Sequence, residues 1–346
     1  MRSVLPVLKL LPLLVVVVAS RTSFADDYRD LFAKVDPSVV VLYTVERVAA
    51  PQLRSGETSA QGLGSGFLIN DEGYIITAAH VVQTADKVRA ELVDGTQIDA
   101  KIIASNPVKD VALLKLASMP SGIKPAKLGD SDKVRVGEEI LVIGAPYGLS
   151  HTLSVGHISA RHTNDGSVLG EVQAETFQTD AAINQGNSGG PMFNRRGEVI
   201  GVVSYIRSRS GGSEGLGFAV TSNAAYEALF EQRTPWSGMS GVLLTGELAA
   251  ALNVPQESGY LVQRVASDSP AARLGLRPSR IPARIGQQEL FIGGDIILSL
   301  NNISLAPGKM REMMEMRKTA MKTGSVAIRV LRDGEVITLD APIPGR

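Results

Sequence analysis

Apolar runs alternate with turn residues along the central part of the chain, from residue 64 to about residue 206. Examples are "GFLIN", "VALLKL" and "EEILVIG", which are rich in the aliphatic and β-branched residues typical of strands. Two of the turns contain Glu-Gly or Asp-Gly, which favours hairpins between neighbouring strands. Many short strands joined by hairpins predict an all-β barrel or sandwich.

Helical periodicity appears on both sides of this region. Residues 26–36 ("DDYRDLFAKVD") predict a short amphipathic helix that a proline ends. Residues 222–232 ("SNAAYEALFEQ") predict a second helix, with Ser222 or Asn223 as its N-cap. A Pro- and Gly-containing linker follows, and after it comes a smaller unit of mixed pattern.

The first 25 residues have the pattern of a secretory signal peptide. A basic start leads into an apolar stretch, and the small residues of "SFA" come just before an acidic pair. We expect cleavage after Ala25 and a location in the periplasm or outside the cell. The alternative is an uncleaved anchor in the inner membrane that faces the periplasm, although the apolar run is short for a span and contains Lys9.

The composition excludes several classes of protein. The chain has 35 basic and 35 acidic residues, and a formal net charge of zero argues against a nucleic-acid-binding protein. It has no cysteine, four histidines and no HExxH sequence, so neither a disulfide nor a thiolate or histidine-rich metal site is expected. We therefore expect no cofactor and no metal.

The sequence "NQGNSGGP" at residues 184–191 places Ser188 among glycines. A serine hydroxyl becomes a nucleophile when a base lies beside it and a third group orients that base. His80 follows an apolar run in "TAAHVV", and Asp110 precedes another in "NPVKDVALLKL". The chain order His80, Asp110, Ser188 is that of the chymotrypsin-type triad.

The glycine-rich loop around Ser188 would also form the oxyanion site of such a catalyst. The N–H groups of Gly186 and Ser188 would stabilise the oxyanion of a tetrahedral intermediate, and glycine adopts the backbone angles that such a loop needs. Taken singly, each triad residue is more often a cap, turn or packing residue, but the three together favour catalysis. The remaining histidines are expected at the surface or in packing roles: His151, His157 and His162.

Residues 64–206 resemble the protease domain of the HtrA/Deg family, whose members are trypsin-fold serine proteases of protein quality control. The resemblance lies in "GSGFLINDEGYIITAAHVV", "NPVKDVALLKL", "GEEILVIGAPYGLSHTLSVGHISA" and "FQTDAAINQGNSGGPMFNRRGEVIGVVSY". The end of the chain resembles a PDZ domain, through "ESGYLVQRVASDSPAARLGL", "GGDIILSLNN" and "VAIRVLRDGEVITL".

The resemblance implies a mainly β chain with a two-barrel trypsin-like domain and a small α+β PDZ domain. The predicted parts are a signal peptide at 1–25, a protease domain at 26–234, a linker at 235–240 and a PDZ domain at 241–346. By this resemblance His80 is the general base, Asp110 its orienting carboxylate and Ser188 the nucleophile.

Three features depart from the family pattern. Gln185 stands where the family often has proline, which would loosen the oxyanion loop. The loop between Glu46 and Gly64 is short, which puts assembly into a cage in doubt. Residues 277–292 form an extra segment that is either a simple hairpin insertion, our preferred interpretation, or a surface that touches the protease domain.

The substrate pocket can be placed by the same resemblance. In trypsin-like folds its floor lies six residues before the nucleophile, which is Ala182 here, so no carboxylate is available to pair with a basic side chain. The run "VVSYI", with Tyr205 and Ile206 at its end, would form an apolar wall. We expect cleavage after small or medium aliphatic residues and not after Lys or Arg.

PDZ domains bind an extended C-terminal peptide at a sheet edge, with its carboxylate on backbone N–H groups. The segment "MSGVLL" matches the family's carboxylate loop, and its first residues are Met239, Ser240, Gly241 and Val242. Opposite it, "KMREMMEMRKTAMK" (309–322) predicts an amphipathic helix with Met313, Arg317 and Met321 on one face. These methionines would either bind apolar ligand side chains or fill a core.

Two classes of function remain open at this point. The first is an exported endopeptidase that cleaves unfolded proteins, with C-terminal peptides bound at the PDZ domain. The second is a peptide sensor or holdase whose triad is rarely competent. The resemblance also implies a homotrimer built through the N-terminal segment, for which Tyr28 and Phe32 are candidate contacts.

Overall fold

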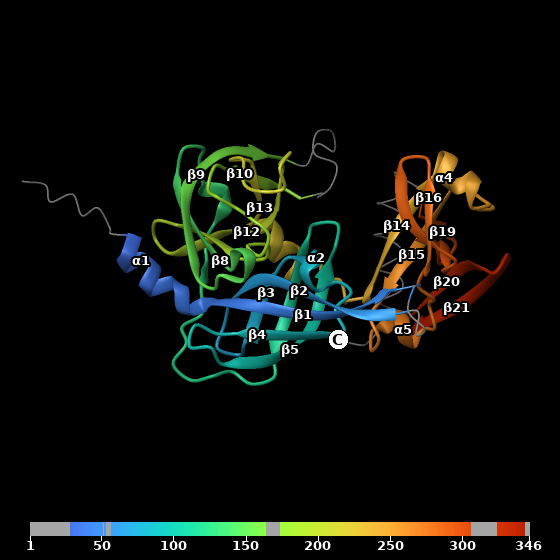
Figure 1. Ribbon diagram of the computed structural model, residues 1–346. Helices are drawn as coiled ribbons and strands as arrows, with labels where there is room; N and C mark the ends of the chain where they lie inside the picture. The colour runs from blue at the N-terminus through green and yellow to red at the C-terminus, as the bar shows by residue number, and fades with distance from the viewer. Residues whose placement is uncertain (1–27, 51, 53–56, 164–173, 306–323, 343–346) are drawn as a thin grey trace, which may run out of the picture.

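The protein folds as two β-barrels and a C-terminal unit (Figure 1). We describe it from a computed structural model that covers residues 28–50, 52, 57–163, 174–305 and 324–342. The predicted signal peptide and the predicted helix at 309–322 lie outside these described residues. Within them, no helix is long and apolar enough to cross a membrane.

The first barrel follows a short N-terminal helix, α1 (Tyr28–Val35), and a single 3₁₀ turn, η1 (Asp36–Ser38). It is closed, with strand order β1-β2-β3-β6-β5-β4. A one-turn helix, α2 (Ala79–Val82), lies between the third and fourth strands. The strands are β1 (Val39–Ala49), β2 (Glu57–Leu68), β3 (Tyr74–Thr77), β4 (Lys87–Glu91), β5 (Gln97–Asn106) and β6 (Val111–Leu116).

The second barrel lies above the first in Figure 1. Its order is β11-β8-β9-β10-β13-β12, and the pairing of β11 with β12 closes it, while β7 (Lys127–Leu128) adds to β12. Two single turns, η2 (Ser131–Lys133) and η3 (Pro146–Gly148), lie in its loops. The strands are β8 (Glu139–Gly144), β9 (Thr152–His162), β10 (Thr176–Thr179), β11 (Pro191–Asn194), β12 (Glu198–Ile206) and β13 (Gly217–Thr221).

The apolar runs are nearly continuous because both faces of many strands are buried. In β6, Leu114 points into the first barrel while Leu113 belongs to the cluster between the barrels. In β8, Leu141 belongs to that same shared cluster, whereas Ile140 and Val142 point into the second barrel. This period-two alternation brings the two barrels together along one apolar seam.

The second predicted helix forms, but its predicted N-cap is wrong. The helix consists of α3 (Ser222–Tyr226) and a π-helical turn, η4 (Glu227–Glu231), and its N-cap is Thr221 in extended conformation. Ser222 and Asn223 are already helical because their side chains bind elsewhere: Ser222 Oγ donates to the carbonyl oxygen of Gly129 at 2.7 Å, and Asn223 Nδ2 donates to Asp130 at 3.0 Å.

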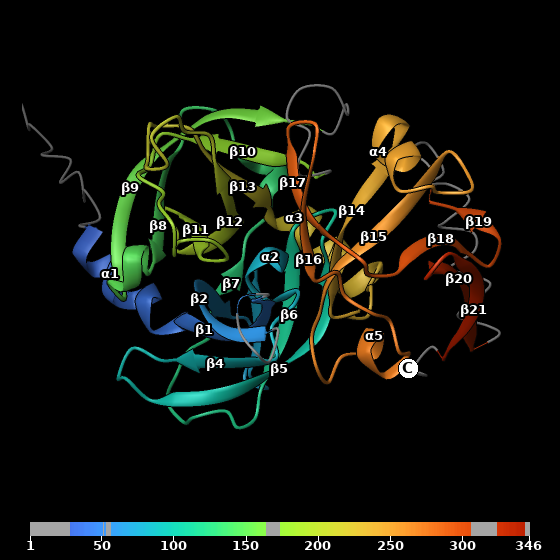
Figure 2. The same cartoon turned by 45° about the vertical axis from the view of Figure 1, so that its right-hand side comes forward.

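The C-terminal unit contains an antiparallel sheet of order β14-β15-β18-β20-β21, with β19 (Ile303–Ser304) paired to β18. Two short helices, α4 (Gly246–Ala251) and α5 (Pro270–Arg273), accompany it. A separate hairpin lies on one side of the sheet (Figure 2). The strands are β14 (Met239–Thr245), β15 (Ser258–Val265), β16 (Ile281–Ile285), β17 (Gln288–Ile292), β18 (Ile296–Leu300), β20 (Ser325–Arg332) and β21 (Glu335–Pro342).

Candidate active site

The structure brings His80 and Asp110 together and places Ser188 on a nearby loop of the other barrel. His80 lies on α2, directly after β3, and Asp110 lies in the turn before β6. Ser188 lies in the loop between β10 and β11. The N–H of Ser65, on β2, donates to the carbonyl oxygen of Ser188 at 2.8 Å, which joins this loop to the first barrel.

Asp110 is held so that its carboxylate faces the imidazole of His80. His80 Nδ1 lies 2.9 Å and 3.0 Å from the two carboxylate oxygens, and the His80 backbone N–H donates to one of them at 3.0 Å. The hydroxyl of Ser204 donates to the other oxygen. Asp110 is buried and has a φ of 51°, a left-handed conformation that aspartate tolerates better than most residues. Its charge is therefore satisfied by hydrogen bonds away from water.

The pKa of His80 is raised above its ordinary value of 6.5. Burial opposes protonation of the ring, but the hydrogen bond and the charge of Asp110 outweigh that penalty. Asp110 therefore favours the protonated form of His80. The His80 side chain is also half exposed, at 51%.

Ser188 makes a different hydrogen bond in the described structure. Its Oγ donates to the carbonyl oxygen of Ser204 at 3.1 Å rather than to the ring of His80. A rotation about the Cα–Cβ bond would redirect the hydroxyl, and such hydrogen bonds often tighten only when substrate is bound.

The loop around Ser188 depends on two glycines. Gly186 has a φ of 105°, and a Cβ there would lie 2.1 Å from the carbonyl oxygen of Ala145. Gly189 has a φ of 84°, and a Cβ there would lie 2.1 Å from Thr77 Oγ1. Neither position can carry a side chain without displacing backbone or core atoms. The loop therefore requires glycine at positions 186 and 189 for two reasons: the positive φ angles and the lack of space for a Cβ atom.

The peptide bond between Gln185 and Gly186 has a defined orientation. The Gln185 carbonyl oxygen accepts a hydrogen bond of 2.9 Å from the N–H of Tyr147. The C=O and N–H of a trans peptide point in opposite directions, so the Gly186 N–H points away from Tyr147. That N–H is the one that the sequence assigns to the oxyanion site.

Ser65 is a residue that the sequence interpretation missed. Its fully buried hydroxyl donates to the carbonyl oxygen of Gly186 at 2.7 Å and accepts from the N–H of Ala145 at 3.0 Å. It therefore fixes the glycine loop from behind, together with the neighbouring loop after β8. The sequence offers a weak signal for this role, because Ser65 is a polar residue between two glycines at the start of a buried run.

The predicted pocket residues lie on the same barrel as Ser188. Ala182 is exposed, and Tyr205 and Ile206 are half-buried at the end of β12. The Tyr205 ring stacks on Phe218 with centroids 4.7 Å apart. Ile206 packs against the core of the second barrel. Their part in substrate selection stays a prediction.

Each of the other three histidine rings lies near the side chain of an aspartate or a glutamine. His151 is largely buried, and its Nδ1 lies 2.6 Å from Asp36, at the end of α1. His157 lies 3.7 Å from Asp180 at the surface. His162 lies 3.1 Å from the side-chain oxygen of Gln178. The described residues contain no cluster of three or more side chains that could hold a metal ion.

The segment that we compared with a carboxylate loop is a strand in the structure. Residues 239–245 form β14, which pairs with β15 along its whole length, with a register shift between Ser240 and Gly241. A Cβ on Gly241 would lie 2.3 Å from the carbonyl oxygen of Leu261, so this shift requires glycine. Within the described residues, the other edge of β14 has no partner strand. Met313 and Arg317 lie outside the described residues.

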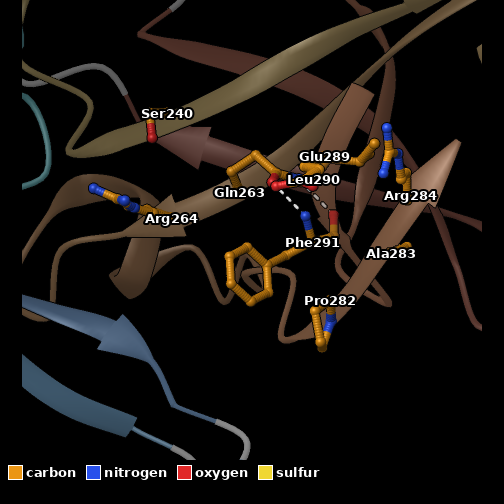
Figure 3. A pocket seen from close by; sticks show the side chains of 9 residues that line it. All are labelled: Ser240, Gln263, Arg264, Pro282, Ala283, Arg284, Glu289, Leu290 and Phe291. Carbon is orange, nitrogen blue, oxygen red and sulfur yellow. Dashed lines mark hydrogen bonds between the residues drawn. The ribbon is translucent and has the colours of Figure 1, made fainter. Parts of the chain in front are cut away.

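The extra segment at 277–292 is a hairpin and also touches the first barrel. Gln263 on β15 exchanges two hydrogen bonds with the backbone of Phe291, at 2.7 Å and 2.9 Å (Figure 3). Arg280, just before the hairpin, lies 2.5 Å from Glu57 on β2. Between the hairpin and β14–β15 lies a cavity of about 640 Å³. Both interpretations of this segment therefore hold.

Comparisons with known proteins agree with this architecture. Residues 64–202 match the family model described as a trypsin-like peptidase domain. A probable periplasmic serine endoprotease, DegP-like, from Pseudomonas fulva is 36% identical over 300 residues, which cover 84% of this chain and 61% of that protein. The corresponding DegP-like protein of Brucella suis biovar 1 is 34% identical over 292 residues, which cover 82% of this chain and 56% of that protein.

Solved structures are also similar over most of the chain. The HtrA-type protease AlgW with a decapeptide is 32% identical, with a TM-score of 0.54, over 92% of this chain and 99% of that one. AlgW with a tripeptide is 33% identical, with a TM-score of 0.52, over 91% and 96%. The chain spans about three fifths of the length of the curated relatives named above. It belongs to the HtrA/Deg family of trypsin-like serine proteases.

Proposed function

We propose that this protein is an exported serine endopeptidase of protein quality control that cleaves unfolded proteins. The observation that carries the proposal is the hydrogen-bonded pair of His80 and Asp110 beside the glycine loop of Ser188. The curated relatives are named as probable periplasmic serine endoproteases, which supports the activity and a periplasmic location. Cleavage after Ala25 is proposed together with that location. An inner-membrane anchor facing the periplasm is the alternative location.

In the proposed mechanism His80 takes the proton of Ser188 as its oxygen attacks the scissile carbonyl carbon. Asp110 keeps the proton of His80 on Nδ1 and stabilises the imidazolium that forms. The N–H groups of Gly186 and Ser188 donate to the oxyanion of the tetrahedral intermediate. His80 then protonates the leaving amine, and water hydrolyses the acyl-enzyme by the same sequence of proton transfers.

Substrate selection is proposed to depend on the absence of charge in the pocket. Ala182 offers no carboxylate to a basic side chain, and Tyr205 and Ile206 supply apolar surface. We therefore propose cleavage after small or medium aliphatic residues. A basic substrate side chain would lose its hydration there without gaining a partner.

The C-terminal unit is proposed to be a PDZ domain that binds the C-termini of other chains. An extended peptide would add to the free edge of β14, with its carboxylate near residues 239–242. The relative AlgW has been solved with a decapeptide and with a tripeptide. Met313 and Arg317 remain candidate contacts for such a peptide.

A homotrimer through the N-terminal segment is also proposed. Tyr28 and Phe32, the candidate contacts on α1, pack partly against the protein's own core. The Arg195 guanidinium lies 4.6 Å from the centre of the Tyr28 ring. The exposed remainder of α1 is therefore the part available to a neighbouring subunit. Light scattering at micromolar concentration should give the mass of three chains, and a monomer would contradict this part of the proposal.

A second function, a peptide sensor or holdase, is favoured by one observation. The Ser188 hydroxyl donates to the carbonyl oxygen of Ser204 rather than to His80, as expected of a resting site.

One experiment distinguishes the endopeptidase from the sensor or holdase. It compares casein cleavage by the mature protein and by Ser188→Ala, each with and without a hydrophobic C-terminal peptide. Cleavage that disappears in Ser188→Ala supports the endopeptidase, and no cleavage under any condition supports the sensor.

A further inference from the structure

The loop at residues 207–216 joins β12 to β13 beside the candidate active site. Its two ends are closed by the N–H of Arg207, which donates to the carbonyl oxygen of Leu216 at 2.9 Å. Ile206, one of the predicted pocket residues, lies at the end of β12 directly before the loop. The loop therefore continues the strand that the sequence assigns to the wall of the substrate pocket.

One carboxylate oxygen of Glu214 accepts four hydrogen bonds from this loop. The N–H groups of Arg209 and Ser210 donate to its Oε1 at 3.1 Å and 3.0 Å. The hydroxyls of Ser208 and Ser210 donate to the same oxygen at 3.1 Å and 2.8 Å. Successive N–H groups of this kind form a concavity that suits an anion, and hydrogen bonds to an ionised group are stronger than neutral ones. Glu214 thus draws residues 208–210 toward itself.

The loop depends on these hydrogen bonds for its shape. No side chain of residues 207–216 belongs to a hydrophobic cluster of the described residues. The pKa of Glu214 is lowered from its ordinary value of 4.5, first by the hydrogen bond from the Ser210 side chain and then by the N–H of Ser210. Glu214 is therefore ionised at neutral pH although it is exposed.

The residue next to Glu214 contacts the loop of the candidate nucleophile. The N–H of Ser213 donates to Asn184 Oδ1 at 2.9 Å. The carbonyl oxygen of Asn184 accepts a hydrogen bond of 3.0 Å from the N–H of Asn187, which directly precedes Ser188. The carboxylate that shapes the 207–216 loop thus lies one residue from the donor that reaches the nucleophile loop.

We infer that Glu214 is a positioning residue, whose carboxylate holds the Ser213 N–H against Asn184 and thereby aligns the loop of Ser188. The inference rests on the proposed function, because it takes Ser188 as the nucleophile. In this inference Glu214 contacts no substrate atom and acts only through the backbone of its own loop. It adds a residue to the site that lies outside both the triad and the oxyanion donors.

Glu214→Ala should lower kcat without preventing folding. It removes the acceptor of all four hydrogen bonds, so the Ser213 N–H is no longer held at Asn184. A change far from the chemistry that misplaces a reacting group can cost about 10²-fold in rate. Since Glu214 acts through two further contacts, we expect about a tenfold fall in kcat and a smaller change in KM.

Two further variants make the test specific. Glu214→Gln is the conservative variant, because it keeps an Oε1 acceptor on a side chain of the same shape, and all four hydrogen bonds go to that atom. Asp94→Ala is the matched control: Asp94 is an exposed carboxylate with a lowered pKa, and it accepts from the N–H of Thr96 at 2.9 Å in the turn between β4 and β5. Circular dichroism and the melting temperature show whether each mature variant is folded.

The experiment measures kcat and KM between about pH 6 and about pH 9, on a chromogenic peptide with an aliphatic residue before the scissile bond. We expect Glu214→Gln and Asp94→Ala to stay within about twofold of the parent kcat. The acid limb of kcat/KM should be the same in all variants, because Glu214 stays ionised throughout this range. Equal kcat in Glu214→Ala and the parent would overturn the inference, as would a shifted acid limb or an equal loss in Glu214→Gln.

A double-mutant cycle tests the connection through Asn184. In an Asn184→Ala background the Ser213 N–H has lost its acceptor, so Glu214→Ala should lower kcat by less than about twofold further. An undiminished tenfold effect in that background would show that Glu214 does not act through Asn184, and would overturn the inference.

Hydrogen exchange of the Ser213 and Asn187 amides gives a readout that does not need cleavage. Both N–H groups are hydrogen-bonded to Asn184 in the structure. We expect faster exchange of both in Glu214→Ala and parent-like exchange in Glu214→Gln and Asp94→Ala. If the parent cleaves nothing, the proposed function fails and this readout alone decides. Faster exchange at Asn187 then supports the positioning role, and unchanged exchange at Asn187 overturns it.

Discussion

The hydroxyl of Ser65 donates a 2.7 Å hydrogen bond to the carbonyl oxygen of Gly186, although the two residues are 121 positions apart in the chain. The same hydroxyl accepts from the N–H of Ala145 at 3.0 Å. One buried side chain of the first barrel thus fixes two loops of the second, and one of these carries the candidate oxyanion donor. The geometry of the site is therefore set across the interface between the barrels.

Ser65→Ala should lower kcat more than it raises KM, because the Gly186 peptide loses its support while the substrate pocket stays intact. The lost hydrogen bonds leave a buried carbonyl and a buried N–H unpaired, at a cost of about 1–3 kcal/mol. Thr44→Val is a suitable control, since the buried Thr44 hydroxyl has no partner in the described structure. It should keep both kcat and stability. Equal kcat in Ser65→Ala and the parent would contradict the positioning role.

Asp110→Asn should leave the fold intact and lower kcat by about 10⁴-fold, because an amide cannot hold the same tautomer of the histidine. The acid limb of the profile of kcat/KM against pH should also move to lower pH. Asp110 raises the pKa of His80 above 6.5 against the effect of burial, and only neutral His80 can act as the base. An unchanged acid limb would mean that His80 is not the titrating base.

The same pair should influence stability with a defined sign. Because the folded pKa of His80 is raised, the protonated pair stabilises the fold below the unfolded pKa, and this stabilisation is lost as pH rises through the folded pKa. Urea unfolding of the parent and Asp110→Asn at about pH 5.5 and about pH 8.5 brackets that range. The difference between the two proteins should be larger at the lower pH.

The sequence allowed the candidate catalytic residues to be predicted because each lies in a short local pattern. Ser188 has glycines beside it, and His80 and Asp110 lie next to apolar strands, so neighbours in the chain carry the signal. The contribution of Ser65 depends on a partner far away in the chain, the carbonyl oxygen of Gly186. A single polar residue in a buried run does not reveal which distant loop it will meet.

The error in the predicted N-cap has a tertiary cause. Ser222 and Asn223 have the right chemistry for an N-cap, but their side chains are engaged by Gly129 and Asp130. A tertiary contact here decides between two structures that the local sequence allows.

Gly186→Ala should reduce kcat by about 10²- to 10³-fold, because the loop must move to accommodate the methyl group and the oxyanion donor moves with it. The new Cβ would lie 2.1 Å from the carbonyl oxygen of Ala145. Gly211→Ala is the matched control, since Gly211 also has a positive φ, of 84°, but nothing lies within 4 Å of its Cβ position. That variant should pay only the conformational cost of about 1–2 kcal/mol and keep its kcat.

Asp36→Ala should destabilise the fold by removing the partner of a buried histidine. His151 Nδ1 lies 2.6 Å from Asp36 Oδ1, the two side chains are 15% and 9% exposed, and His151 Nε2 is buried without a partner. The variant leaves both ring nitrogens unpaired at the point where α1 meets the loop after β8, and we expect a loss of about 1–3 kcal/mol. Asp99→Ala is the control, because it removes a surface ion pair with Arg89 in which the side chains of Arg89 and Asp99 are 55% and 75% exposed. Surface contacts of that kind contribute about 0–1 kcal/mol, so urea unfolding at neutral pH should separate the two variants clearly. Equal unfolding midpoints would show that the buried pair does not hold α1 against the second barrel.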